Sequence, residues 1–484
     1  MTSTVNYIVE SLSLGKHKMR GDSVDSDDLR NAFAMAMSQM YRDEVPLYGD
    51  LMRIVLNSNQ MIHQEGAQHD SLERLTVERH GAIRLGKPQE LRMVSRIFSV
   101  LGMHPVGYYD LSVADLPMHA TCFRPVDQSS LQRNPFRVFT TLLRPDLLRS
   151  DAARNLALKL LSQRQIFSSE LTRILDVVEQ KGRLSPEEAV IFIHEALKTF
   201  SWAPPAASTH EEYLALKQEH PILADIACFK TAHINHLTPR TLNINSTSNS
   251  MVKEGMQVKD TIEGPPLRKC PILLRQTSFL ALEEPIQFLG DDHEGVLVGS
   301  HRARFGEIEE RGAAVTPAGR KLYDELLVET MAATRGLGSE NAELIRRKIF
   351  EKYPDTWSEL REKGLVYSQY RCGKNITNLF DVDAIEITPN IDCKAIEHLI
   401  EIGALEATFI TYEDFLPFSA AGIFQSNLDQ KSNRNVVRPG PDQDTMEKAL
   451  GGPIIDPDSL YKAAQRNSLV SSLLELQTKA TGCK

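Results

Sequence analysis

The sequence lacks the short motifs by which several large enzyme classes are recognised. It contains no G-x-x-x-x-G-K-[ST] phosphate loop, no G-x-G-x-x-G, no H-E-x-x-H and no G-x-S-x-G. These motifs serve phosphate binding, dinucleotide binding, zinc proteolysis and serine nucleophile chemistry, respectively. Their absence therefore argues against NTPases, Rossmann enzymes, zincins and α/β-hydrolases.

Other features are scarce as well. The six cysteines are scattered without a C-x-x-C pair, which argues against a zinc knuckle or a disulfide framework and favours a reducing compartment. No apolar run approaches the roughly 18 residues of a membrane span, and the N-terminus lacks a secretory apolar core. The net charge of −9 offers no basic surplus for nucleic acid. We therefore expect a cytoplasmic protein with neither membrane nor nucleic acid as a partner.

What is present is ordinary globular composition, with 42% hydrophobic and 25% charged residues in 484. A chain of this length can bury a large core without metal staples, so a bound metal would serve chemistry. The acidic balance does not exclude a small anionic substrate, because one buried arginine can capture a carboxylate.

Hydrophobic periodicity predicts a mixed α+β protein. Residues 26–62 are helical with a break at Glu44-Val-Pro, and a strand, a helix and three strands follow at 78–86, 87–102, 103–111, 118–124 and 136–143. Helices at 151–200 and a linker from Trp202 separate this series from a similar one. The second series has a strand and turn at 229–243, a helix at 248–259 and strands at 271–279, 284–289 and 302–310. Helices then cover 317–364, and a compact motif at 412–427 precedes two late helices.

Two histidine segments and one acidic strand could carry chemistry. His80 and Arg84 share one face of their strand, with Cα atoms about 13 Å apart, which leaves room for a small dicarboxylate between a metal and a guanidinium. The alternative is a pair of polar residues on a solvated face. His233 and His236 face opposite sides of a strand, so at most one is an in-facing ligand unless the chain turns.

Glu307 and Glu309 share a face of the strand in RARFGEIEERG, beside apolar Phe305 and Ile308. A salt bridge to a nearby arginine would also explain a carboxylate there. Two histidines and one carboxylate suit Fe(II) and leave positions for a 2-oxo acid and O₂. Residue spacing alone does not select such a trio from fourteen histidines.

Longer segments resemble a known family. ERHGAIRLG, HINHLTPRTL, EGPP, PILLRQTSF, ARFGEIEERG, TPAGR and YEDFLPFSAAGIFQSNL are similar to the 2-oxoadipate dioxygenase/decarboxylases, also called hydroxyglutarate synthases. The resemblance runs from about residue 30 to about residue 465. It implies metal ligands at His80, His236 and Glu307, with Glu309 outside the ligand set.

The resemblance also implies substrate contacts. They fall on His80, Arg84, Phe418 and Ser419, with Arg84 on the far carboxylate of the substrate. Phe418 is bulkier than the valine of the family pattern, and a tighter pocket follows if its side chain makes the contact.

The implied fold is a vicinal-oxygen-chelate-like core. Two βαβββ modules would form a curved sheet around the metal, with added helical segments. The expected segments are an extension (1–25), helices with the first module (26–150), a helical insertion (151–205), the second module (206–316) and a C-terminal region completing the site (317–484).

The implied activity is Fe(II)-dependent conversion of 2-oxoadipate and O₂ to 2-hydroxyglutarate and CO₂, in lysine breakdown. Two alternatives remain open at this point. One is a related metalloenzyme acting on a different 2-oxo acid, and the other is a catalytically silent scaffold on the same fold.

Overall fold

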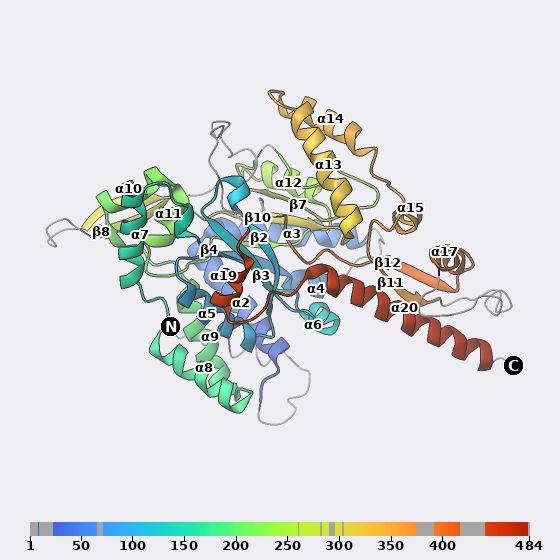
Figure 1. Cartoon of the computed structure of the whole chain (residues 1–484), viewed down its shortest axis with the longest axis horizontal. Coiled ribbons are helices and arrows are strands. Elements are labelled where there is room, and N and C mark those ends of the chain that lie inside the picture. Colours follow the sequence, from blue (N-terminus) through green and yellow to red (C-terminus); the bar gives the residue numbers. More distant parts are fainter. Residues whose placement is uncertain are drawn as a thin grey trace. The chain divides into compact units, whose positions relative to one another are not determined.

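The structure is a computed structural model of the chain, drawn in Figure 1. It describes residue 8 and residues 23–64, 71–259, 261–280, 283–289, 296–302, 304–373, 392–416 and 441–482. Contacts group the chain into two units. One comprises Met1–Lys259, Gln276–Glu309 and Phe415–Ile455, and the other comprises Asp260–Arg275, Glu310–Asp414 and Asp456–Lys484. The finer division expected from the sequence stays a prediction.

The first unit contains the predicted series of strand, helix and three strands. Its elements are β1 (Arg79–Leu85), α5 (Pro88–Val100), β2 (His104–Asp110), β3 (Met118–Arg124) and β4 (Arg137–Leu143). With β6 (His236–Pro239) they form a five-stranded sheet of order β2-β3-β4-β1-β6. Strand β1 therefore lies inside the sheet, parallel to β4 and antiparallel to β6.

Local sequence explains why these elements were predictable. Every residue of β3 and β4 is buried, as expected for strands covered on both faces. Helix α5 begins with Pro88, which suits a first helical turn, and the Glu90 carboxylate accepts from the backbone N–H of Gly86 at 2.9 Å. Its apolar stripe, including Leu91 and Val94, is buried.

Further helices of this unit surround the sheet. They are α2 (Ser26–Glu44), α3 (Pro46–Gln64), α4 (Leu72–Val77), α6 (Gln128–Arg133), α7 (Asp151–Gln163), α8 (Ser169–Lys181), α9 (Pro186–Phe200), α10 (His210–Glu219), α11 (Pro221–Ala227), α12 (Ile244–Lys253) and α19 (Gln443–Leu450). The predicted break near Glu44 is confirmed, because α2 ends there and Pro46 opens α3. In Figure 1, α7, α10 and α11 gather beside β8.

The second series of strands is less regular than the first. Its strands are β7 (Leu274–Ser278), β8 (Glu284–Leu289), β9 (Val296–His301) and β10 (Glu307–Arg311). Strands β7 and β10 pair with each other, whereas β8 and β9 join β5 (Pro205–Thr209) in a separate sheet. A parallel bridge between Arg240 and Glu309 connects the end of β6 to β10. Strands β1, β6 and β10 are thus neighbours.

Three predictions are corrected here. The linker from Trp202 contains β5, a strand that depends on its distant pairing with β8. The helix expected at 248–259 runs over Ile244–Lys253, because the Asn243 side chain caps it by accepting from the Ser246 N–H at 3.0 Å. The strand expected at 302–310 begins at Glu307, and β9 precedes it.

The second unit is mainly helical. Its elements are α13 (Pro317–Ala333), α14 (Ser339–Phe350), α15 (Trp357–Glu362), β11 (Ser368–Cys372), α17 (Cys393–Glu401), β12 (Leu405–Phe409) and α20 (Pro457–Gly482). Strands β11 and β12 pair antiparallel, and α20 runs along β11. Among the described helices of both units, none has the length and apolar character that crossing a membrane requires.

Candidate metal centre

Three neighbouring strands present His80, His236 and Glu307 on one face. His80 and Ala82 share a face of β1, and Ala82 lies directly opposite His236 on β6. Arg240 lies four residues after His236 and therefore on the same strand face. Its bridge partner Glu309 shares a face of β10 with Glu307. Strand alternation therefore turns the three side chains in the same direction.

The distances among the three side chains fit a single bound ion. His80 Nε2 lies 3.9 Å from Glu307 Oε1, and His236 Nε2 lies 3.9 Å from Glu307 Oε2. One ligand atom from each residue lies within 4.8 Å of the others. All three side chains are buried. We call them the metal trio.

The state of His236 supports a ligand role. Within the described parts of the chain, neither of its ring nitrogens has a hydrogen-bond partner, although the ring is fully buried. Burial, with the charges of His80 and Arg84, holds its pKa well below the usual range. The ring is therefore neutral and keeps a lone pair for a metal. Two imidazoles and one carboxylate are the donor set of mononuclear Fe(II) sites with open positions.

Two further buried residues hold the trio in place. The Gln276 amide donates a hydrogen bond to Glu307 Oε1. Glu309 Oε2 lies 3.0 Å from His80 Nδ1, the nitrogen on the opposite edge of the ring from Nε2. Groups placed in this way next to metal ligands help to orient them. The structure thus separates Glu307, beside Nε2 of both histidines, from Glu309.

A buried ionic cluster adjoins Glu309. Arg137 Nη1 lies 4.0 Å from Glu309 Oε1, and its Nη2 donates to Glu78 at 2.9 Å. Glu78 also accepts from Arg74 at 3.0 Å and from Arg240 at 3.1 Å. Glu78 and Glu309 are completely buried, and the arginines compensate charges that would otherwise be costly to bury.

Aromatic rings form walls beside the trio. The Phe415 ring centroid lies 4.9 Å from that of His80, and Phe305 lies 4.9 Å from His236. Phe139, on the neighbouring strand β4, packs against Phe415 at 5.4 Å. Apolar walls limit the access of water to a reaction at this position.

Arg84 lies four residues beyond His80 on the same strand face, as predicted. Its Nη1 donates to Asp225 Oδ2 at 2.6 Å, and its charge is close enough to contribute to the lowered pKa of His236. The sequence-based analysis missed Asp225 and Gln276. A single acid inside the apolar segment PILADIA is a signal that could have drawn attention to Asp225.

A second buried trio has the same composition. Asp225, His233 and His301 also bring one ligand atom each within 4.8 Å of one another. We call it the aspartate trio. The other predicted substrate contacts, Phe418 and Ser419, lie outside the described residues, so their placement stays a prediction.

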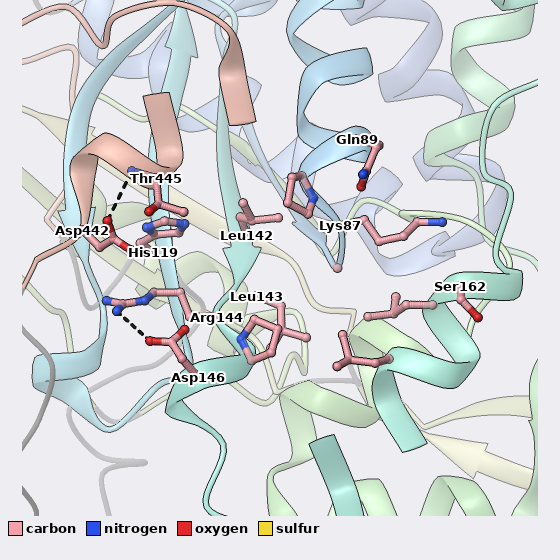
Figure 2. Close-up of a pocket in the computed structure, with 15 residues that line it drawn as sticks. Lys87, Gln89, His119, Leu142, Leu143, Arg144, Asp146, Ser162, Asp442 and Thr445 are labelled. Atoms are coloured by element: carbon pink, nitrogen blue, oxygen red, sulfur yellow. Dashed lines mark hydrogen bonds and ion pairs between the residues drawn. The ribbon is translucent and has the colours of Figure 1, made fainter. Parts of the chain in front are cut away.

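A pocket of about 350 Å³ opens elsewhere in the first unit (Figure 2). It includes Gly86, two residues beyond Arg84, and Arg144 and His119 line one wall. Burial, with the nearby charge of Arg144, lowers the pKa of His119 to about 4. The lining contains no member of the metal trio.

The sheet brings two histidines and one carboxylate together as a buried candidate site for one metal ion. Comparison with known proteins gives the family of the chain. Residues 33–427 match the family described as 2-oxoadipate dioxygenase/decarboxylase, and the chain belongs to this family.

Individual relatives cover nearly the whole chain. The 2-oxoadipate dioxygenase/decarboxylase of Escherichia coli K12 is 45% identical over 92% of this chain and 98% of its own length. The Pseudomonas putida protein of the same name is 43% identical over 93% and 97%. The solved structure of hydroxyglutarate synthase from Pseudomonas putida, in complex with 2-oxoadipate, has a TM-score of 0.83 at 40% identity. It covers 94% of this chain and 100% of that one.

Proposed function

We propose that this chain is an Fe(II)-dependent 2-oxoadipate dioxygenase that releases CO₂ and forms 2-hydroxyglutarate. The observation that carries the proposal is the convergence of His80, His236 and Glu307 in a chain so similar to relatives of that name. The reaction balances: 2-oxoadipate and O₂ together contain the atoms of 2-hydroxyglutarate and CO₂. The setting proposed is lysine breakdown in the cytoplasm.

The metal trio would hold the ferrous ion. Bound there, Fe(II) would supply coordination positions for the 2-oxo acid and for O₂. Gln276 would keep the Glu307 carboxylate in place, and Glu309 would limit the movement of the His80 ring by facing its Nδ1. Phe415 and Phe305 restrict water around the reacting carbon atoms.

Arg84 would bind the distal carboxylate of the substrate. A guanidinium can bind a carboxylate through two parallel hydrogen bonds, which sets position as well as charge. Holding the far end of the chain would bring the carbon beside the keto group to the reaction centre. Phe418 and Ser419 are proposed as further contacts of the substrate.

The proposed fold is a vicinal-oxygen-chelate-like core of two modules. The run β1-α5-β2-β3-β4 would be the first, and β6, α12 and β7–β10 would supply the second, with the hairpin β8–β9 as an addition. This proposal rests on element order and on the ligands from β1, β6 and β10.

Oxygen uptake tests the function directly. Protein loaded anaerobically with Fe(II) is mixed with 2-oxo acids of graded length, and CO₂ and hydroxy acid are quantified. We expect the six-carbon dicarboxylate to react fastest, with one CO₂ released per O₂ consumed. Preference for another 2-oxo acid would correct the substrate, and absence of oxygen uptake with every acid would refute the proposal.

A further inference from the structure

Asp225 is a buried carboxylate that joins Arg84 to the aspartate trio. It lies on α11, and its side chain is almost inaccessible to solvent. Its Oδ2 accepts from Arg84 Nη1 at 2.6 Å and from the Asn235 amide at 3.3 Å. Its Oδ1 lies 2.8 Å from His301 Nε2 and 3.2 Å from His233 Nε2. Both carboxylate oxygens are therefore in use.

The charges in this network are matched. Burial alone would favour the neutral acid, but Arg84 and His233 hold the pKa of Asp225 well below its usual range. Burial lowers the pKa of His233, although Asp225 opposes that effect. Asp225 is therefore a negatively charged carboxylate and His233 a neutral imidazole. Arg84 is the cation that balances the charge of Asp225. Removing either partner of a buried ion pair leaves an uncompensated charge in the interior, which is strongly destabilising.

The outer layer of the network restrains Asp225 from the other side. Tyr213 Oη lies 2.9 Å from His301 Nδ1, while His301 Nε2 faces Asp225. His301 therefore has a polar partner at each of its ring nitrogens. The Trp202 ring lies parallel to His301, with an interplanar angle of 8° and centroids 6.2 Å apart.

We propose that Asp225 is a positioning residue that fixes the guanidinium of Arg84 for recognition of the distal carboxylate. This inference rests on the proposed function, in which Arg84 reads that carboxylate. A guanidinium carries five N–H donors in one rigid plane, so a contact at one nitrogen fixes the orientation of the others. Asp225 holds Nη1 of the Arg84 guanidinium and thereby sets the plane in which the guanidinium meets the substrate. Asp225 itself has no contact with the substrate in this scheme.

Asp225, His233 and His301 could instead bind a second metal ion. The aspartate trio offers two imidazoles and a carboxylate, the same ligand types as the metal trio. Arg84 argues against this, because its positive charge lies 2.6 Å from the carboxylate that would receive the cation. His301 also has a partner at each nitrogen. Both oxygens of Asp225 and both nitrogens of His301 therefore have partners in the protein, and within the described residues His233 Nδ1 is the one nitrogen of the two rings without a hydrogen bond.

A double-mutant cycle tests whether Asp225 acts through Arg84. The readout is the ratio of kcat/KM for 2-oxoadipate to kcat/KM for 2-oxohexanoate, which lacks the distal carboxylate. Asp225→Asn should lower this ratio about tenfold, mainly through a higher KM for 2-oxoadipate. Arg84→Met should lower it ten- to hundredfold. The double variant should match Arg84→Met, because the effect of Asp225 is exerted through Arg84 and the two effects are therefore not additive.

Anaerobic equilibrium binding provides a readout that does not depend on turnover. Asp225→Asn should weaken the binding of 2-oxoadipate about tenfold and leave that of 2-oxohexanoate nearly unchanged. Asp225→Glu, which retains the charge, should recover part of the affinity. The matched control is Glu90→Gln, which removes another buried carboxylate, paired with Arg164 at Nε 2.9 Å away. It should leave the ratio unchanged.

The possible outcomes separate the two proposals. The positioning role would be overturned if the double variant lowered the kcat/KM ratio by the product of the two single effects. Tighter binding of 2-oxoadipate by Asp225→Asn would also overturn it. A second metal ion per chain in the wild type that is lost in Asp225→Asn would overturn it in favour of a metal site. If the wild type binds neither acid and consumes no O₂, the proposed function itself fails. If wild-type activity is intact but the ratio is insensitive to Asp225, only the positioning role fails.

Discussion

The metal trio and the aspartate trio have the same composition but different surroundings. Each combines two histidines and one acid, buried in the same unit. In the aspartate trio, the carboxylate is paired with Arg84, and His301 contacts a partner at both nitrogens. In the metal trio, His236 has no hydrogen-bond partner at either nitrogen within the described residues. Composition alone would have rated the two equally.

The comparison shows that the two trios differ in the partners of their ligand atoms rather than in their composition. Buried polar groups in proteins are normally satisfied. Within the described residues His236 lacks a hydrogen bond at both ring nitrogens, whereas in the aspartate trio His233 lacks one at Nδ1 and His301 lacks none. A guanidinium beside a carboxylate argues against a metal ion at that carboxylate, because the guanidinium already supplies the balancing positive charge. The predictions below address this difference, beginning with the one of largest effect.

Removal of a metal-trio ligand should abolish activity. His80→Ala, His236→Ala and Glu307→Ala should each lose bound iron and reduce oxygen uptake to background, while circular dichroism stays close to that of the wild type. The fold should survive because the core is large. His233→Ala is the matched control for iron content alone, because it removes a histidine three positions from His236 but in the other trio, and it should keep its iron. Full iron occupancy in His236→Ala would show that His233, or another residue, is the real ligand.

Replacing Arg84 should change selectivity more than overall turnover. A charge-assisted hydrogen bond contributes about 1.5–3 kcal/mol, or about one to two orders of magnitude in kcat/KM. Arg84→Met should therefore lower the preference for 2-oxoadipate over 2-oxohexanoate by that factor. Arg84→Lys should recover only part, because an ammonium does not reproduce the two-pronged contact. An unchanged ratio in steady-state kinetics would assign the carboxylate to another residue.

Glu307 and Glu309, which share one face of β10, should differ in their effect on iron binding. Glu307→Gln should remove iron binding, whereas Glu309→Gln should retain it with an affinity roughly 10–100-fold weaker, as is typical for partners of metal ligands. Gln276→Leu should behave like Glu309→Gln, because it leaves Glu307 without its amide donor. Iron titration under anaerobic conditions measures all three. Loss of iron in Glu309→Gln but not in Glu307→Gln would show that the ligand is misassigned.

The sequence predicted contiguous features better than distant ones. The run β1-α5-β2-β3-β4 was predicted because each element has its own periodicity and burial. Strand β5 was missed, since it consists of five residues stabilised by pairing with β8. His80, His236 and Glu307 came from the resemblance, because strand alternation could not select between Glu307 and Glu309. Asp225 and Gln276 were missed because their partners are far away in the sequence.

The smallest expected effect concerns the acid stability of the aspartate trio. Burial lowers the pKa of His233, with Asp225 opposing, so the folded state favours the neutral ring. An unfolded histidine titrates near about pH 6.5, and below that value the unfolded state binds more protons. The contribution of His233 to stability is therefore complete above about pH 6.5 and declines as the pH falls, by at most about 1.4 kcal/mol per pH unit.

His233→Asn should make the free energy of unfolding less dependent on pH between about pH 6.5 and 5 than it is in the wild type. Asp225 does not obscure this window, because its pKa lies well below the usual carboxyl range and its contribution is lost only at lower pH. Urea unfolding of metal-free protein at several pH values gives the slopes, and removing the metal avoids competition between protons and iron. The exposed His104 supplies the matched control, His104→Asn, which should keep the wild-type slope. An identical slope in His233→Asn and wild type would mean that folding does not shift the pKa of His233, whereas a steeper rise of stability with pH in the variant would mean that the aspartate trio holds a protonated imidazole. Either result would require a new charge balance with Arg84.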